Sequence, residues 1–248
     1  MITINNVETY GWEAAIRGMR NPMNSWDKSD TKVCDRYQID EYCSYWSHID
    51  DKCPYCNNCE NGTRVNDFQW LHLGENDLDL MKRLSKAGTD HRKFMRMITV
   101  YCDITAPLYW WKEFDTYKVG TVANSCSTMH KIAEKEFALD DFSYEHLDVR
   151  AKRLLEDIID ALNDYRNLYI NYNPNEFEIK GCPRKKDIWW QMIQLLPSSY
   201  EQKRTVMLNY EVLANMYKSR RNHKLDEWNT FCDWIEMLPY SELITGEK

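Results

Sequence analysis

The spacing of apolar and polar residues predicts strands and helices over the first half of the chain. Residues 1–32 are typical of a strand followed by a short helix at 11–19. Residues 97–104 (MITVYCDI) are rich in β-branched side chains and predict a second strand. Ala106-Pro107 then places a proline at the first turn of a helix that continues through LYWWKEFDTY.

Between these two segments, the sequence predicts a further helix. Asp77 can cap its first turn, and Gly88 is suited to end it. Three apolar residues share one face of this helix: Leu78, Met81 and Leu84.

The second half of the chain is predicted to be mostly helical. Residues 148–168 predict one long amphipathic helix. Its apolar face consists of Leu154, Leu155, Ile158, Ile159 and Leu162. A polar break with two prolines follows at 171–184, and residues 204–217 and 224–237 predict two more helices. The pattern predicts an α+β fold with a helix-rich C-terminal third, in a single domain over residues 1–248.

Composition narrows the classes of function. The 32 Lys and Arg against 39 Asp and Glu give a formal net charge of −7, whereas a general DNA-binding protein needs a basic face. We expect no DNA partner, although a small basic pocket for one nucleotide is compatible with this charge. No run approaches the roughly 20 apolar residues that cross a bilayer, and the N-terminus has no signal-peptide pattern. We expect a cytoplasmic protein without a membrane partner.

Residues 33–66 are polar, poor in aliphatic side chains and rich in cysteine, so we interpret them as a loop or small insertion. Cys53, Cys56 and Cys59 follow one another at C-x-x-C spacing, and Cys43 precedes them. These four thiols predict a structural zinc site, since a metal can organise a segment that has no core. Free thiols, a disulfide and an iron–sulfur site are the alternatives, because the spacing is not that of two standard zinc knuckles.

The remaining cysteines and two tryptophan pairs are interpreted as core residues. The pairs are residues 110–111 and 189–190, and large aromatic side chains dominate core burial. The scattered cysteines are most simply small buried side chains: Cys102, Cys126, Cys182 and Cys232.

Residues 80–128 carry a recognisable pattern, LMKRLSKAGTDHRKFMRMITVYCDITAPLYWWKEFDTYKVGTVANSCST. It resembles the central region of flavin-dependent thymidylate synthases. In that family a helix ends in Gly-His, a strand leads to Ala-Pro, and the motif R-H-R-x-x-S-x-N-E-x-S-x-R follows the next helix. Ala106-Pro107 stands at the Ala-Pro, and His91 falls near the histidine. With Asp90, His91 is either an acid–base pair or a structural residue.

The R-H-R part of the motif is altered. Read without gaps, residues 116–118 (Thr-Tyr-Lys) occupy its position, so that only Lys118 keeps a positive charge, and Thr121 stands at the first serine. The resemblance implies that Tyr117, Lys118 and Thr121 contact FAD. The phosphate site should be weaker than in the family, because lysine cannot reproduce the bidentate fork of arginine.

Two registers are open in the rest of the motif. The gapless register places Asn124 at the glutamate, Cys126 at the second serine and Thr128 at the final arginine. A slip of one residue matches Asn124 to the asparagine and Ser127 to the serine. The resemblance implies cofactor contact for Asn124 and nucleotide contact for Cys126 and Ser127. His130 could reach a bound anion in place of the missing arginine.

The C-terminal part is similar to the family as well. In the family, an N-L-R segment is followed by a helix that ends in L-R. Asn209 matches the asparagine of the first segment, and Arg220 matches the arginine of the second. The resemblance implies flavin contact for Asn209 and nucleotide contact for Arg220, with a plain surface position as the alternative for each. Lys112 and Glu113 stand at an Arg-Gln near the nucleotide. At most one of them can line a pocket, since neighbours on a helix point in different directions.

The resemblance implies a fold with a central sheet flanked by helices, FAD as cofactor, dUMP or a related pyrimidine nucleotide as substrate, folate and NADPH as further partners, and a homotetramer. Three functions remain open. The first is a transferase that methylates dUMP to dTMP or makes a related nucleotide modification. The others are a catalytically inactive nucleotide-binding protein on the same scaffold and a flavin enzyme with a different substrate. Residues 116–130 are the favoured site in each case, because short hydroxyl and amide side chains make good ligand walls.

Overall fold

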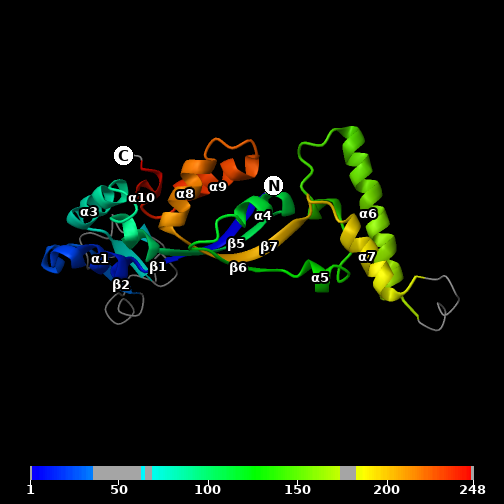
Figure 1. The fold of residues 1–248 in the computed structure, drawn as a ribbon, viewed down its shortest axis with the longest axis horizontal. Coiled ribbons are helices and arrows are strands. Elements are labelled where there is room, and N and C mark those ends of the chain that lie inside the picture. The colour runs from blue at the N-terminus through cyan, green and yellow to red at the C-terminus, as the bar shows by residue number, and fades with distance from the viewer. Residues whose placement is uncertain (1, 36–62, 65–68, 174–182, 247–248) are drawn as a thin grey trace, which may run out of the picture. The chain divides into compact units, whose positions relative to one another are not determined.

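The structure is a computed structural model that describes residues 2–35, 63–64, 69–173 and 183–246 (Figure 1). The chain forms two compact units, which we describe separately. Unit 1 comprises Met1–Thr3, Ile104–Thr116 and Asn124–Arg204, and unit 2 comprises Ile4–Asp103, Tyr117–Ala123 and Thr205–Lys248. The single domain over residues 1–248 stays a prediction.

An antiparallel sheet has the strand order β1-β5-β7-β6. Its strands are β1 (Thr3–Tyr10), β5 (Thr99–Pro107), β6 (Val122–Ser125) and β7 (Glu201–Asn209). Alternate residues of β5, from Val100 to Ala106, are buried, because successive side chains point to opposite faces of a sheet. The strand predicted at 97–104 is confirmed with slightly shifted bounds, and the fold is α+β with helices beside the sheet, as predicted.

The helix predicted at 204–217 is wrong in its first six residues. Residues 204–209 belong to β7, and helix α8 (Tyr210–Arg220) begins only after them. Asn209 sets this boundary, because its side chain accepts a hydrogen bond from the backbone N–H of Val212.

Unit 2 is built around α8, which is buried on most sides. Helices α9 (Asp226–Glu236), α10 (Glu242–Thr245) and η5 (Arg92–Arg96) pack against it. The buried residues of α8 are Tyr210, Glu211, Val212, Leu213, Ala214, Met216 and Tyr217. The predicted helix at 224–237 is confirmed by α9, and the predicted strand and helix at the N-terminus by β1 and α1 (Trp12–Arg20). Two short helices follow α1, η1 (Asn21–Met23) and η2 (Trp26–Lys28).

The predicted capping role of Asp77 is wrong. Helix α3 (Glu75–Lys86) begins after Gly74, and the Asp77 side chain is fully buried in its first turn. Its carboxylate lies 2.7 Å from Nε of the buried Arg20 and accepts hydrogen bonds from the hydroxyls of Ser29 and Thr31. Burial raises the pKa of Asp77, but these hydrogen bonds and the Arg20 charge outweigh it, and the pKa falls below its ordinary value. Asp77 therefore joins α1 to α3.

The ends of the segment predicted as a loop or small insertion are strands. Strands β2 (Lys32–Asp35) and β3 (Thr63–Arg64) both pair with β4 (Gln69–His72), in the order β2-β4-β3. Backbone pairing joins Val33 to Leu71 and Thr63 to Leu71, both antiparallel. The rest of the predicted insertion, residues 36–62 and 65–66, lies outside the described residues.

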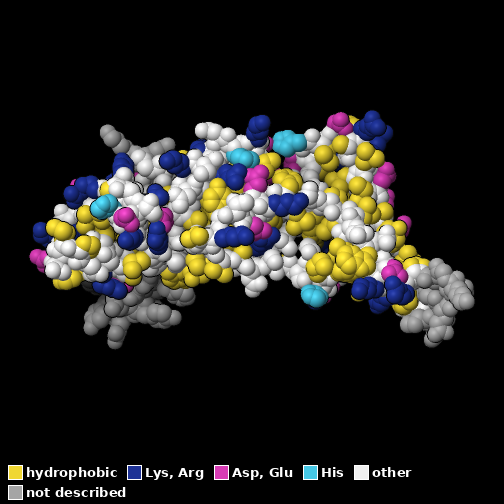
Figure 2. Space-filling model, in the orientation of Figure 1, with side chains coloured by type: hydrophobic (Ala, Val, Ile, Leu, Met, Phe, Trp, Pro, Cys, Tyr) yellow, Lys and Arg dark blue, Asp and Glu magenta, His cyan; other side chains and the backbone are white. Residues whose placement is uncertain are grey.

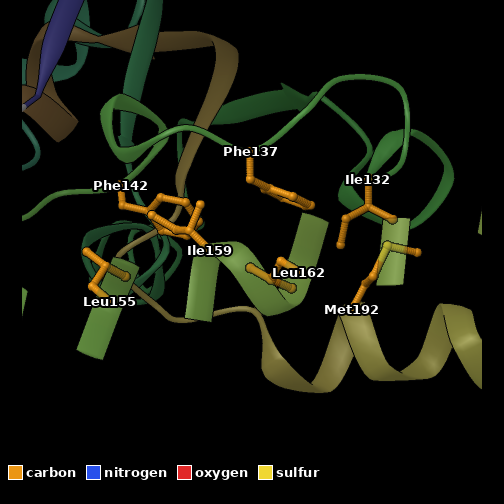
Figure 3. Close-up of a cluster of buried hydrophobic side chains, with 7 residues drawn as sticks. All are labelled: Ile132, Phe137, Phe142, Leu155, Ile159, Leu162 and Met192. Carbon is orange, nitrogen blue, oxygen red and sulfur yellow. The ribbon is translucent and has the colours of Figure 1, made fainter. Parts of the chain in front are cut away.

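Unit 1 contains α4 (Leu108–Phe114), α5 (Thr128–Lys131), η6 (Leu139–Asp141), α6 (Val149–Ile170) and α7 (Lys185–Leu195). Helix α6 confirms the long helix predicted at 148–168, and α7, which was not predicted, packs along it. Figure 3 shows the shared core, which consists of Ile132, Phe137, Phe142, Leu155, Ile159, Leu162 and Met192. Leu154, predicted on the buried face, is 55% exposed.

The first tryptophan pair is core, as predicted, and the second is so only in part, because Trp189 is partly buried against the core of unit 1. Trp110 and Trp111 on α4 are buried, whereas Trp190 on α7 is 39% exposed. Helix α4 begins directly after Pro107, as predicted, but it ends at Phe114 rather than continuing to Tyr117. Among the described helices, none is long and apolar enough to cross a membrane.

Candidate functional site

Residues 117–121 of unit 2 form a short loop that is fastened to the start of α8. The Thr121 hydroxyl donates a hydrogen bond to the Tyr117 carbonyl oxygen. Gly120 has a φ of +83°, and a Cβ at this position would lie 2.4 Å from Nδ2 of Asn209. Glycine is therefore required both by its backbone conformation and by this close approach. The Asn209 amide lies 3.5 Å from the Gly120 carbonyl oxygen through Nδ2, and it caps α8 through Oδ1.

Arg220 lies at the other end of α8, against aromatic side chains. Its Nε donates a hydrogen bond of 2.9 Å to the Tyr117 hydroxyl, and its Nη1 lies 3.0 Å from Nε2 of His223. The guanidinium carbon is 4.8 Å from the ring centroid of the buried Trp228 and 5.6 Å from that of Tyr117. Such contacts with ring faces attract a guanidinium and set its plane. The structure thus brings together Tyr117 and Arg220, which the sequence assigned to cofactor and nucleotide respectively.

A second arginine cluster, which the sequence analysis missed, lies near the start of α8. The largely buried Glu211 accepts a hydrogen bond of 3.2 Å from Nε of Arg92 and is paired with Arg96. Arg92 also donates through Nη2 to Oδ1 of Asn215, at 3.1 Å. Burial raises the pKa of Glu211, but the hydrogen bonds and charges of Arg96 and Arg92 outweigh it and lower the pKa below its ordinary value of 4.5. Asp90, predicted as a partner of His91, lies 3.7 Å from Nζ of Lys93.

In unit 1, Cys126 and Ser127 form a turn that is held by β7. The Cys126 N–H donates to the Lys203 carbonyl oxygen at 3.0 Å, and the Cys126 carbonyl oxygen accepts from Nε2 of Gln202 at 2.9 Å. Ser127 caps α5, because its hydroxyl accepts a hydrogen bond of 3.1 Å from the His130 N–H. The backbone of this turn is fixed on both sides.

Arg204 supports the same turn and was also missed. Its guanidinium carbon is 4.1 Å from the ring centroid of Trp111. Its Nη1 lies 2.7 Å from Oδ1 of Asp115, and its Nε donates to Oε1 of Gln202 at 3.0 Å. No short sequence motif could have indicated this cluster, because Arg204 and Asp115 are 89 residues apart.

The other predicted site residues are exposed. In unit 1 these are Lys112 on α4, Asn124 on β6, and Cys126 and His130, and in unit 2 Lys118. Their predicted ligand contacts stay predictions.

Of the scattered cysteines, two are buried as predicted. Burial raises the pKa of the Cys102 thiol to about 12 and that of Cys232 to about 11. Cys126 is exposed, so its interpretation as a core residue is wrong. Cys182 lies outside the described residues.

The predicted zinc ligands Cys43, Cys53, Cys56 and Cys59 all lie outside the described residues, so the zinc site stays a prediction. Within the described ranges, no group of three or more His, Cys, Asp or Glu side chains is placed to hold a metal ion.

The residues that the resemblance assigns to FAD do not reproduce a cationic phosphate site. The Tyr117 hydroxyl faces Arg220, and the Thr121 hydroxyl is bonded within its own loop. Asn209 contacts Gly120 and Val212 through its two amide atoms. Lys118 is the one cation among these assigned residues, and a single ammonium group offers no bidentate contact to a pyrophosphate.

Sequence comparisons found no matching family model and no matching curated protein. Comparison with solved structures shows that the chain has the fold of flavin-dependent thymidylate synthases. Two structures of the synthase ThyX from Helicobacter pylori with FAD and dUMP are 13% and 12% identical to it, with TM-scores of 0.58 and 0.59. They cover 98% and 99% of this chain and 99% and 98% of their own chains.

A third similar structure is that of the UMP/dUMP methylase PolB from Streptomyces cacaoi bound with 5-Br dUMP. It is 12% identical, has a TM-score of 0.57, and covers 99% of this chain and 95% of its own. At these identities the likeness establishes the fold, which is that of the family the sequence resembles.

Proposed function

We propose that this protein recognises a pyrimidine nucleotide, dUMP or a close relative, through Arg220. The observation that carries the proposal is the placement of the Arg220 guanidinium against Trp228 and Tyr117. A planar guanidinium is suited to bidentate contacts with an anionic ligand. The similar ThyX and PolB structures contain dUMP and 5-Br dUMP, which supports a ligand of the same class here.

A second candidate is a flavin-dependent enzyme that modifies this nucleotide, with FAD as cofactor and with folate and NADPH as co-substrates. The ThyX structures contain FAD, and their match extends over nearly the whole chain, which supports this candidate. The altered phosphate site at residues 116–118 favours the first candidate. We therefore rank nucleotide binding without flavin chemistry first, and a flavin enzyme with dUMP or another substrate second.

The test combines calorimetry with absorption spectroscopy of the purified full chain. Titration with dUMP should give saturable binding, and a matched titration with dAMP should give at least tenfold weaker binding. A flavin spectrum before or after addition of FAD would promote the second candidate and justify an assay for dTMP formation. Absence of dUMP binding at millimolar concentration would overturn the proposed function.

We also propose that the protein is a homo-oligomer, with four copies as the resemblance implies, and that it acts in the cytoplasm on its nucleotide. Helix α6 supports self-association, because it and the residues before it expose Leu147, Leu154 and Leu168, at intervals of seven and fourteen residues. Figure 2 shows hydrophobic side chains gathered over α6 and α7 on the face in view. Light scattering behind size exclusion would measure the mass, and a monomer at micromolar concentration would contradict the proposal.

A further inference from the structure

Tyr117 occupies the middle position of the altered R-H-R segment, where the resemblance implies contact with the cofactor. In the structure its side chain is half-buried, and its hydroxyl accepts the hydrogen bond from Nε of Arg220 at 2.9 Å. Its ring meets that of Trp228 edge to face, with centroids 6.1 Å apart. Both contacts place the phenol beside Arg220, the residue that the resemblance assigns to the nucleotide.

The contacts around Arg220 fix its guanidinium from three directions. Tyr117 accepts at Nε within the guanidinium plane, His223 lies beside Nη1, and Trp228 covers one face. A free arginine side chain has several rotatable bonds, and ordering it on binding reduces affinity. A group that orders the guanidinium beforehand therefore raises affinity without touching the ligand.

We propose that Tyr117 is a positioning residue for Arg220 and contributes to nucleotide recognition rather than to cofactor binding. This inference rests on the proposed function, in which Arg220 contacts the nucleotide. The phenol holds Nε of Arg220, so that the guanidinium keeps the orientation in which it meets its ligand. The alteration from the family's motif at this position then changes the role of the residue from cofactor contact to support of the nucleotide arginine.

The test is a double-mutant cycle on dUMP affinity, measured by calorimetry on the full chain. Tyr117→Phe keeps the ring and removes the hydroxyl, and it should weaken dUMP binding by up to about tenfold, because binding must then order the released arginine side chain. In an Arg220→Ala background the same change should have no further effect. FAD affinity, wherever wild type binds FAD, should change less than twofold.

Tyr217→Phe is the matched control. Tyr217 also lies on α8, and its hydroxyl donates to Oε1 of Glu236 at 2.7 Å, so the variant loses a comparable hydrogen bond away from Arg220. It should bind dUMP within twofold of wild type. Tyr117→Leu, which removes both ring and hydroxyl, gives a second measurement if Tyr117→Phe folds poorly, and it should weaken dUMP binding at least as much.

The outcomes separate the two proposals. If wild type binds dUMP and Tyr117→Phe binds it equally well, the assignment of Tyr117 is wrong and the proposed function stands. Equal losses in the wild-type and Arg220→Ala backgrounds, or a larger loss for FAD than for dUMP, would also overturn the assignment. If wild type does not bind dUMP, the proposed function fails and this inference fails with it.

Discussion

The two ends of helix α8 hold arginines in different ways. At its start, Glu211 pairs with Arg92 and Arg96, so a carboxylate organises two cations. At its end, Arg220 is oriented by the phenol of Tyr117 and the indole of Trp228, which contact its Nε and its guanidinium carbon. Ion pairing and aromatic packing can therefore position arginine side chains for different purposes. We interpret the first arrangement as structural and the second as part of the ligand site.

The largest expected effect concerns the structural end. Glu211→Gln removes the charge that Arg92 and Arg96 share, and Glu211 is only 9% exposed. We expect a loss of about 2–3 kcal/mol in the free energy of unfolding, measured by urea denaturation, with dUMP affinity within twofold of wild type. Asp233→Asn, which breaks an exposed pair with Arg221, should cost less than about 1 kcal/mol. A large loss of dUMP affinity in Glu211→Gln would contradict the interpretation of the start of α8 as structural and of its end alone as part of the ligand site.

The next effect concerns the ligand end. Arg220→Ala should weaken dUMP binding by about 2 kcal/mol, roughly thirtyfold in Kd, because it removes a charged donor. The neighbouring Arg221→Ala is the control, since Arg221 pairs with Asp233 and Glu236 of α9 instead. Calorimetry on both variants would decide the point, and equal affinities for dUMP would show that Arg220 has no role in binding.

A smaller effect is expected at the loop that joins the two ends. Gly120→Ala introduces a Cβ at φ +83° and within 2.4 Å of the Asn209 amide. The free energy of unfolding should fall by about 1–2 kcal/mol. Gly88→Ala has a similarly positive φ of +103° but open space around its Cβ, so it should lose less. If thermal unfolding shows equal losses of stability for Gly120→Ala and Gly88→Ala, the close approach to Asn209 contributes nothing to stability.

The smallest effect is the pH dependence of the structural end. The pKa of Glu211 is lowered in the folded protein, so its contribution to stability is present above its ordinary value of 4.5 and is lost as pH falls through the folded-state pKa. The stability difference between wild type and Glu211→Gln should change by less than about 0.5 kcal/mol from pH 7 to pH 5.5 and shrink below pH 4.5. Denaturation curves over this range would measure the stability difference. A difference that grows on acidification would contradict the lowered pKa of Glu211.

Local patterns were sufficient to predict the elements whose burial is regular. The apolar face of α6 predicted Leu155, Ile159 and Leu162 in the core, and the proline at the start of α4 marked its first turn. The error at 204–209 arose because apolar residues there fit a helical face and a buried strand alike. Asn209, a favoured N-cap residue, was the signal that could have placed the boundary.

The contacts of the candidate site could not be predicted in this way. Tyr117 and Arg220 are 103 residues apart, and Arg96 and Glu211 are 115 apart, so no periodicity relates them. The resemblance selected Tyr117, Asn209 and Arg220 individually, and only the fold shows which of them meet. Gln202 and Arg204 were missed for the same reason, since they act on Cys126 and Asp115 from a distant strand.

Loop 117–121 touches α8 at both ends, through Gly120 at Asn209 and through Tyr117 at Arg220. Helix α8 has 11 residues, and at 1.5 Å per residue it is roughly 16 Å long. The distance between the two attachments is therefore fixed by the helix. The loop residues and the long side chains of Tyr117 and Arg220 must bridge that distance. Insertion or deletion of a single loop residue would release one attachment, whereas substitutions of Lys118 and Val119, the exposed residues between the attachments, would be tolerated. In descendants of this chain, selection should act on the length of the loop and on its attachment residues more strongly than on Lys118 and Val119.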